Sequence, residues 1–228
     1  EMSSSVISKN GYGIVKNVIR IDIPKLLDEF KSQLKDEQFI EKEFEYGAFN
    51  HSGKKLISKS TWQIVSFFAK DSKCSKILFF KQLPLVGNKG EMLSIKAPKL
   101  NVSYILKSRI FVVPFGMDYF WIGVTFELED KTLKPSFKAK KWLEKYLKKI
   151  ISIPYKVVFH LAGIRPTVTD IKPLLGLHHN YENLLVFNGL GTRGSLMAQL
   201  LSEWLFKFFH ENIPLPKQID ISRFKKIK

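Results

Sequence analysis

The sequence predicts an α+β fold in which a mostly antiparallel sheet is flanked by helices. Seven short segments rich in β-branched and aromatic residues follow one another between residues 39 and 126, with turn signals between them. Few helical patterns interrupt this series, and a run of strands without helices between them is typical of antiparallel sheets. The length of 228 residues and the hydrophobic content of 45% are enough to bury a sizeable core.

The N-terminal part is expected to hold a loose segment, a strand and a helix. Residues 1–11 are polar, and Ile14–Ile21 has the composition of a strand. Asp22 is a suitable helix cap, and Pro24 fits the first helical turn. The apolar residues that follow have the spacing of a core-facing helix: Ile23, Leu26, Leu27, Phe30 and Leu34.

The central part is expected to consist of the seven strands. They are Phe39–Tyr46, Trp62–Phe68, Ile77–Phe80, Met92–Ile95, Val102–Leu106, Ile110–Phe115 and Tyr119–Phe126.

The remaining part is expected to contain two helices and two strands. Pro135–Ile151 is the clearest helix, with one apolar face formed by Phe137, Leu143, Tyr146, Leu147 and Ile150. Tyr155–Phe159 and Leu184–Phe187 are predicted strands, and the second is wholly apolar, as buried strands are. Ser195–Phe209 is a final helix whose circumference is mostly hydrophobic, which indicates packing on more than one side.

The charge and cysteine content bear on partners and compartment. The formal net charge is +16, which fits either a polyanion-binding protein or a generally lysine-rich chain. Six lysines of Pro135–Ile151 allow the same two interpretations, a nucleic-acid or membrane surface and a solvated helix face. The single cysteine, Cys74, suggests a reducing compartment, and the apolar runs are too short to span a bilayer. We therefore expect a cytoplasmic protein without a membrane partner.

A glycine motif, Gly189-Leu-Gly191-Thr-Arg-Gly194, matches the dinucleotide-binding pattern G-x-G-x-x-G. A dinucleotide-binding unit needs a further strand with an acidic residue after its helix, and the short tail from Asn212 onward, which begins with two prolines in its first five residues, does not supply one. Two interpretations remain. The turn into the helix can present backbone N–H groups to an anion or a polarised carbonyl, or the glycines only permit a tight turn.

Arg165 lies in an otherwise apolar stretch, Ala162–Gly176. An arginine in such surroundings needs an anionic partner. One interpretation is a substrate carboxylate, which fits the guanidinium fork; the other is a structural bond to Asp170 or to loop carbonyls. Spacing alone does not separate the two.

Several of these stretches resemble the D-amino-acid oxidase-like superfamily of FAD-dependent oxidoreductases. The C-terminal signature consists of Gly163-Ile-Arg-Pro-Thr-Val-Thr-Asp170, Pro173-Leu-Leu-Gly176 and Leu185–Gly194 followed by an apolar helix. Weaker similarities lie in Ile21–Leu27, in Lys89-Gly90-Glu91-Met-Leu, in Val113–Asp118 and in Gly123–Glu127. With interruptions, the resemblance runs from about Tyr12 to Phe224.

The resemblance implies the substrate domain of such a flavoprotein, at residues 12–160, and a C-terminal flavin-contacting segment, at residues 161–228. That segment would include a strand, glycine loop and helix belonging to the FAD domain. The reaction implied is oxidation of an amine or amino acid, in which a hydride passes from the carbon next to nitrogen to flavin N5. By match to the motif, Arg165 would bind the substrate. The cofactor-binding residues would be Gly163, Gly189, Leu190, Gly191, Thr192, Arg193 and Gly194. No catalytic base and no metal site is assigned.

The sequence departs from this family at its start, because it has no N-terminal strand, G-x-G-x-x-G turn and helix. We therefore expect a missing dinucleotide-binding domain or chain, and weak or absent FAD binding by this chain alone. The alternative functions are a basic polyanion-binding protein, such as a component of a tRNA-modifying enzyme, and a degenerate non-catalytic homologue. Salt-sensitive tRNA binding would favour the first of these.

Overall fold

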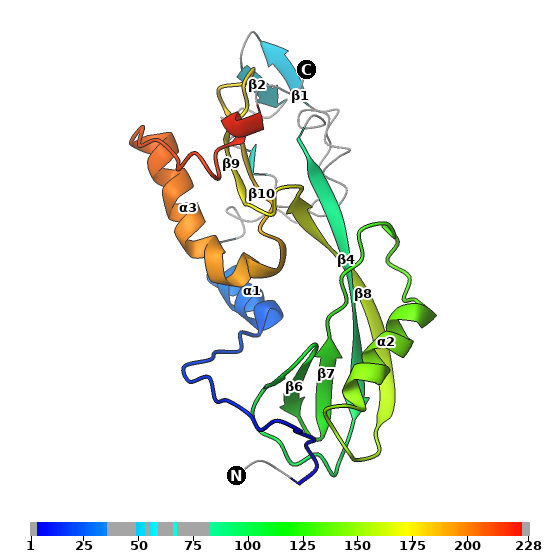
Figure 1. Cartoon of the computed structure of the whole chain (residues 1–228). Helices are drawn as coiled ribbons and strands as arrows, with labels where there is room; N and C mark the ends of the chain where they lie inside the picture. Colours follow the sequence, from blue (N-terminus) through cyan, green and yellow to red (C-terminus); the bar gives the residue numbers. More distant parts are fainter. Residues whose placement is uncertain (1–3, 36–48, 53–54, 59–65, 68–82, 225–228) are drawn as a thin grey trace. The chain divides into compact units, whose positions relative to one another are not determined.

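The computed structural model describes residues 4–35, 49–52, 55–58, 66–67 and 83–224. The chain divides into two compact units. The first unit comprises residues 1–14 and 87–165, and the second comprises residues 15–86 and 166–228. Two long strands, β4 (Leu85–Lys96) and β8 (Lys156–Val168), begin or end in the second unit and lie mostly in the first (Figure 1).

The first unit is built on a five-stranded sheet with the order β5-β6-β7-β4-β8. Its short strands are β5 (Leu106–Lys107), β6 (Phe111–Gly116) and β7 (Tyr119–Gly123). β6 and β7 form a two-residue hairpin whose central residues, Met117 and Asp118, have positive φ angles of 43° and 66°. Such angles belong to the tight turns that match the twist of antiparallel strands. β7 also pairs antiparallel with β4, with Ser94 opposite Trp121.

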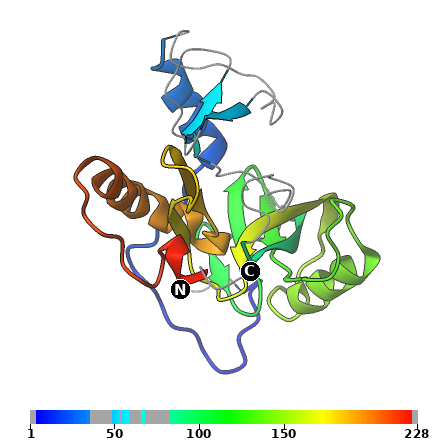
Figure 2. The same cartoon turned by 90° about the horizontal axis from the view of Figure 1, so that it is seen from above.

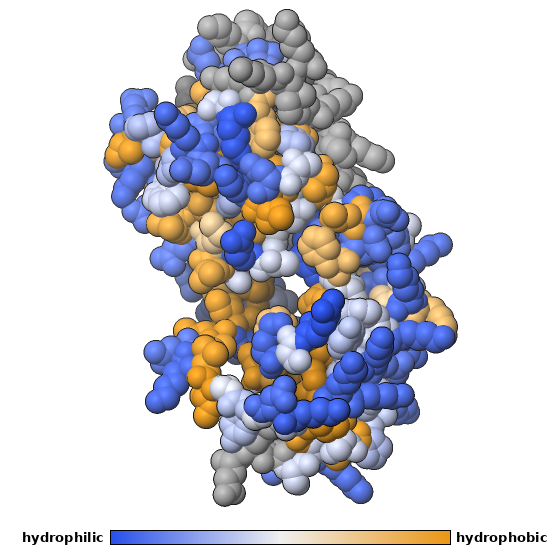
Figure 3. Space-filling view, viewed as in Figure 1, coloured by the Kyte–Doolittle hydropathy of each residue, from blue (hydrophilic) through white to orange (hydrophobic). Residues whose placement is uncertain are grey.

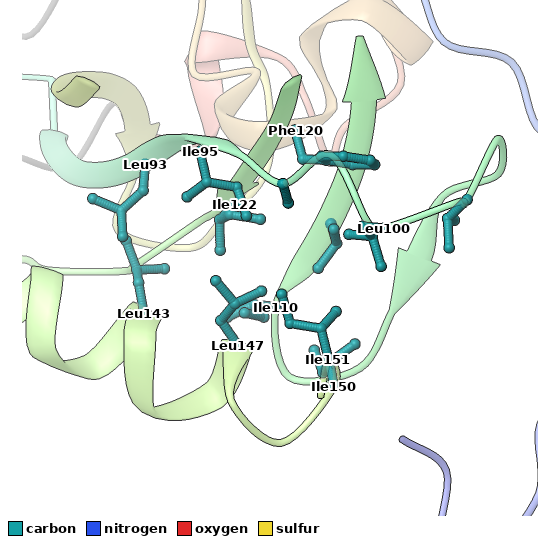
Figure 4. Packing of buried hydrophobic residues seen from close by; sticks show 13 residues of the cluster. Leu93, Ile95, Leu100, Ile110, Phe120, Ile122, Leu143, Leu147, Ile150 and Ile151 are labelled. Atoms are coloured by element: carbon teal, nitrogen blue, oxygen red, sulfur yellow. The ribbon is translucent and has the colours of Figure 1, made fainter. Parts of the chain in front are cut away.

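Helix α2 (Phe137–Leu147) covers one face of this sheet, beside β4 and β8 (Figures 1 and 2). Ser136 caps the helix by accepting a hydrogen bond from the backbone N–H of Ala139. Leu93, Ile95 and Ile122 of the sheet point toward Leu143 and Leu147 of α2, and all five are fully buried (Figure 4). This burial excludes water from one face of the sheet and fixes which residues lie on the other.

The second unit contains a three-stranded sheet of the order β3-β10-β9. β10 (Leu184–Asn188) pairs antiparallel with β9 (Leu174–Leu177) and parallel with β3 (Ser66–Phe67). Helix α3 (Gly194–His210) follows β10 after a short 3-10 helix, η4 (Gly191–Arg193). The core of this layer joins Leu175 and Leu185 of the sheet to Leu201 and Leu205 of α3.

The second unit also contains helix α1 (Ile23–Ser32), the antiparallel pair β1 (Phe49–Ser52) and β2 (Lys55–Ser58), and a 3-10 helix, η5 (Ile221–Phe224). The predicted start of α1 is confirmed, because Asp22 Oδ1 accepts a hydrogen bond from the N–H of Lys25 at 3.2 Å and Pro24 lies in the first turn. Among the helices in the described ranges, none is long and apolar enough to cross a bilayer.

The predicted α+β class is confirmed, and several element predictions need correction. Ile14–Ile21 is not a strand: its residues are exposed, and no strand of the described chain pairs with them. Residues 102–105 also lie outside any strand, so that only Leu106 of that prediction is in β5. The predicted strands Phe39–Tyr46 and Ile77–Phe80, and most of Trp62–Phe68, lie outside the described residues.

Two predicted strands are much longer than expected. Met92–Ile95 is the end of the twelve-residue β4, and Tyr155–Phe159 overlaps the start of the thirteen-residue β8. The extra part of β4 includes Gly87-Asn-Lys-Gly90, whose composition is that of a turn. It is a strand because its backbone pairs with its neighbours in the sheet, and sequence propensity does not register such pairing.

Candidate functional site

The sheet of the first unit has one face free of α2, which we call the open face. Successive residues of a strand alternate between faces, and residues paired across strands share one. Because Leu93 and Ile122 pack against α2, the open face carries Gly90, Met92 and Trp121. Phe111 and Phe115 belong to it as well, and the rings of Phe115 and Trp121 lie 5.0 Å apart. About two-fifths of the surface of Trp121, Phe111 and Phe115 is exposed.

Arg165 reaches the open face from β8. Its guanidinium lies directly over Gly90, since a Cβ atom placed on that glycine would come within 1.8 Å of Nη2. Only glycine at position 90 leaves this space. The side chain of Arg165 is half-buried, and in the described part of the chain it makes no hydrogen bond and no ion pair. Burial lowers the pKa of Arg165, and no carboxylate among the residues that the structure describes opposes that effect.

Space for a ligand exists on one side of this guanidinium. Gly163 lies two residues before Arg165 on β8, so both residues face the same side of the sheet. Gly163 is exposed, and a Cβ atom placed on it would meet no other atom within 4 Å. An anion that approaches Arg165 beside Gly163 therefore meets little obstruction from the strand itself.

Asp170, the structural partner considered for Arg165, is engaged elsewhere. Its Oδ2 atom lies 2.9 Å from Nε of Arg223, and Oδ1 lies 3.3 Å from Nη2 of the same residue. Burial raises the pKa of Asp170, but the hydrogen bonds from Arg223 and from the N–H of Lys172 outweigh burial and lower it. The Asp170–Arg223 pair ties the chain after β8 to η5 within the second unit.

A buried charge network lies on the opposite side of β4, toward α2. Lys89 is fully buried, and its Nζ atom donates to Oδ2 of Asp130 and to the carbonyl of Lys134, both at 2.6 Å. Glu91, also buried, accepts from the N–H and the hydroxyl of Ser136 at 2.7 and 2.8 Å. Its carboxylate also lies 3.5 Å from Nζ of Lys89 and 2.9 Å from Nε2 of His160, the latter without hydrogen-bond alignment.

The pKa shifts in this network follow from its contacts. Burial lowers the pKa of Lys89, but the hydrogen bond to Asp130 and the charge of Glu91 outweigh burial and raise it. Burial raises the pKa of Glu91, but the bonds from Ser136 and the charge of Lys89 outweigh it and lower the pKa. Lys89, Glu91 and Asp130 thus stay charged at neutral pH, and their contacts attach the N-terminus of α2 to the sheet. From the sequence, Lys89 and Glu91 were assigned only to the motif Lys89-Gly90-Glu91, and their role in a buried charge network was missed.

The glycine motif forms the passage from β10 to α3. Gly189 and Gly191 have φ angles of +72° and +58°, which favour glycine. A Cβ atom on Gly189 would lie 2.4 Å from Cγ2 of Val168, so this glycine also permits close packing. Neither η4 nor α3 has a side chain that caps its N-terminus, and the neighbouring Thr192 and Arg193 are exposed. Backbone N–H groups at this end are therefore available to a ligand.

The other loop residues predicted to bind the cofactor differ in their contacts. Leu190 packs against the core beneath α3, and Arg193 donates from Nη2 to the carbonyl of Ile171 at 3.2 Å. Gly163 and Arg165 belong to the first unit, whereas Gly189–Gly194 belong to the second. Substrate binding by Arg165 and cofactor binding by Gly163 and the glycine loop stay predictions.

The lysines of α2 lie away from the buried side of that helix. Lys138, which is 91% exposed, is the clearest example, and the surface over α2 is largely hydrophilic (Figure 3). Phe137 was expected on the apolar face of α2 but is exposed. The buried residues of this helix are Ala139, Leu143 and Leu147. The exposure of the lysines agrees with both interpretations, a solvated face and a polyanion surface.

Residues 72–207 match the DAO family, described as FAD dependent oxidoreductase. Solved structures with a similar fold include iminodiacetate oxidase from Chelativorans sp. BNC1, at 15% identity and a TM-score of 0.61, over 75% of this chain and 51% of that one. L-proline dehydrogenase from P. horikoshii is 17% identical, with a TM-score of 0.58, over 70% of this chain and 46% of that one. Glycine oxidase from Geobacillus kaustophilus is 22% identical, with a TM-score of 0.55, over 69% and 44%.

The match covers more than half of the residues, and the chain belongs to the DAO family of FAD-dependent oxidoreductases. The resemblance inferred from the motifs is therefore confirmed. The chain spans about half the length of the solved structures that it resembles.

Proposed function

We propose that this chain forms the substrate-binding part, and the flavin-ring contact, of an FAD-dependent oxidoreductase that oxidises an amine or amino acid. The observation that carries the proposal is Arg165, a half-buried cation that has no partner in the described chain and lies beside open space on a sheet face rich in aromatic residues. A substrate carboxylate would supply the missing negative charge in a geometry suited to two parallel hydrogen bonds.

The aromatic residues of the open face suit the rest of such a substrate. Trp121 and Phe115 present apolar surface to the same side as Arg165. Apolar walls exclude water and strengthen the attraction between a guanidinium and a carboxylate. In this arrangement Arg165 fixes the orientation of the substrate, so that its carbon–nitrogen bond is held in one place.

The residues of the glycine loop fit the ring end of a flavin. When bound, FAD would accept the electron pair that leaves the carbon–hydrogen bond next to nitrogen, and the imine product would be hydrolysed by water. Where η4 and α3 begin, no side chain caps the N–H groups, and those of Gly191, Thr192 and Gly194 would stabilise negative charge on a ring carbonyl. We also propose that Arg193 adds positive charge there. The division into a substrate part, 12–160, and a flavin-contacting part, 161–228, belongs to this proposal, as does a cytoplasmic location.

The substrate site is tested by titrating the purified chain with glycine, N-methylglycine and acetate and following backbone amide shifts by NMR. We expect all three to bind with shifts around Arg165 and Gly163, and Arg165→Leu to weaken binding about tenfold to a hundredfold, the loss of a charge-assisted pair. Arg109→Leu is the matched control. It removes the same charge from the first unit, where Arg109 stacks on Tyr146 of α2. Equal affinities in the wild type and Arg165→Leu would refute the assignment.

The flavin contact is tested by comparing FAD with riboflavin in fluorescence-quenching titrations. A chain that contacts only the ring binds both weakly and with similar affinity, because the ADP half of FAD adds no contact. Tight, stoichiometric binding of FAD but not of riboflavin would contradict the proposed ring contact. It would mean that this chain binds the nucleotide half.

A further inference from the structure

Asn88 of β4 is a buried amide without hydrogen bonds. The residue has no exposed surface, and within the described ranges neither Nδ2 nor Oδ1 has a partner. Its neighbours on the strand are also buried and polar, but Lys89 and Glu91 have several partners each. An unpaired buried amide costs free energy, and natural proteins retain few of them. Hydrogen bonding to a ligand would explain why this unpaired amide is present.

The face on which Asn88 lies follows from its neighbours. Lys89 and Glu91 contact residues on the α2 side of the sheet, so that Asn88 and Gly90 lie on the open face. The guanidinium of Arg165 occupies that face above Gly90. The Cα atoms of Asn88 and Gly90 are about 7 Å apart, two residues along a strand. One amide and one guanidinium, neither with a partner among the described residues, are therefore placed on the same face at neighbouring positions.

We propose that Asn88 and Arg165 form one binding subsite, in which Asn88 determines specificity for a ligand that carries a carboxylate and an adjacent N–H group. This inference rests on the proposed function. Arg165 takes the carboxylate. The Asn88 amide carries an NH2 donor group and a carbonyl acceptor, so that Nδ2 donates to a carboxylate oxygen and Oδ1 accepts from the ammonium group.

The subsite explains why both groups are needed on the ligand. A simple carboxylate would leave Oδ1 of Asn88 without a donor, and a simple amine would leave both Nδ2 and Arg165 without an acceptor. Burying polar groups that remain unpaired is the strongest basis for rejecting a similar ligand. The site would therefore prefer an α-amino acid over acetate and over methylamine.

The group that lies over the strand two residues from Asn88 is a flexible side chain. The atoms that lie over the strand at Gly90 are the end of the flexible Arg165 side chain. A carboxylate bound beside Gly163, where space is open, would lie on the same face as Asn88 while the guanidinium stays above Gly90.

The test uses Asn88→Leu, which is nearly isosteric, in NMR titrations of the full chain with glycine, acetate and methylamine. We expect the melting temperature to stay the same or rise, because an unpaired amide is removed. We also expect glycine affinity to fall at least tenfold and the preference for glycine over acetate to disappear. A lower melting temperature with an unchanged preference would overturn the proposal, because it would show that the amide is structural.

Asn88→Asp provides the second variant, since it keeps the size of the side chain and replaces the donor with a negative charge. It should lose acetate binding and gain methylamine binding; unchanged acetate affinity would overturn the proposal. If Arg165→Leu abolishes glycine binding while both Asn88 variants match the wild type, the proposed function stands and this inference fails. If the wild type binds glycine and acetate no better than Arg165→Leu does, the proposed function fails and the inference fails with it.

Discussion

At the scale of single residues, the contact between Arg165 and Gly90 links a strand glycine to a candidate ligand site. Gly90 has no positive φ angle, so its backbone tolerates a side chain, and the obstacle is the guanidinium above it. The guanidinium is the end of a flexible side chain and can move away. Position 90 therefore controls the placement of Arg165 more than it controls folding.

We predict that Gly90→Ala changes the melting temperature little and weakens carboxylate binding about tenfold, because the new methyl group displaces the Arg165 guanidinium. Melting curves and acetate titrations measure the two effects. The control is a double-mutant cycle, in which Gly90→Ala has no further effect on acetate affinity once Arg165→Leu is present. Additive effects would mean that Gly90 acts independently of Arg165.

A second prediction at this scale concerns Ser136, the N-cap of α2. Ser136 accepts from the N–H of Ala139 and donates to buried Glu91. We predict that Ser136→Ala lowers the free energy of unfolding by about 2 kcal/mol, since it removes a helix cap and a hydrogen bond to a charged group. Urea unfolding measures this. Ser103→Ala, at an exposed loop serine of the same unit, should have no measurable effect.

At the scale of elements, the glycines between β10 and α3 have different structural roles although they belong to one motif. Gly189 has a positive φ and would bring a Cβ atom into Val168, whereas Gly194 has a helical φ of −53° and more room, with Leu190 at 3.8 Å. The motif thus combines a closely packed turn that requires glycine with an ordinary first residue of a helix.

We predict opposite stability effects for alanine at these two positions. Gly189→Ala should destabilise the second unit by more than about 1 kcal/mol, through the strained φ and the contact with Val168. Gly194→Ala should leave the stability unchanged or raise it by about 0.5 kcal/mol, because alanine favours helix. Urea unfolding of both variants provides the comparison. Equal destabilisation would show that the turn is not set by Gly189.

At the scale of the whole molecule, the buried charges couple stability to pH. The hydrogen bond from Lys89 is the main cause that lowers the pKa of Asp130 from 3.8 to about 2. The pKa of Glu91 is also lowered, from an ordinary value of 4.5. Groups whose pKa is depressed in the folded state stabilise it above their ordinary pKa and lose that contribution as pH falls through the folded value. Lys89, whose pKa is raised, contributes below 10.5 and loses its contribution at higher pH.

We therefore predict a stability plateau that falls below pH 4.5 and again above pH 10.5, measured as the urea midpoint at each pH. Lys89→Met should lower the plateau and flatten its acid side between pH 3.8 and about 2, because Asp130 then titrates near its ordinary pKa in the folded state as well. Lys138→Met, at a lysine that is 91% exposed, is the charge-matched control. An unchanged acid slope in Lys89→Met would contradict this account.

The sequence by itself determined the α+β class, the cap of α1, the approximate positions of α2, β6, β7, β10 and α3, and the family. These features depend on local spacing, on residues such as Asp22 whose side chain bonds to nearby backbone, and on motifs that are continuous in the chain. Only the tertiary structure decided the length of β4 and β8, the absence of a strand at Ile14–Ile21, the Asp170–Arg223 pair and the position of Arg165 over Gly90. Each of these depends on which distant residue becomes a neighbour, since strands exist only where another strand pairs with them and a charge is satisfied only by what folding brings beside it.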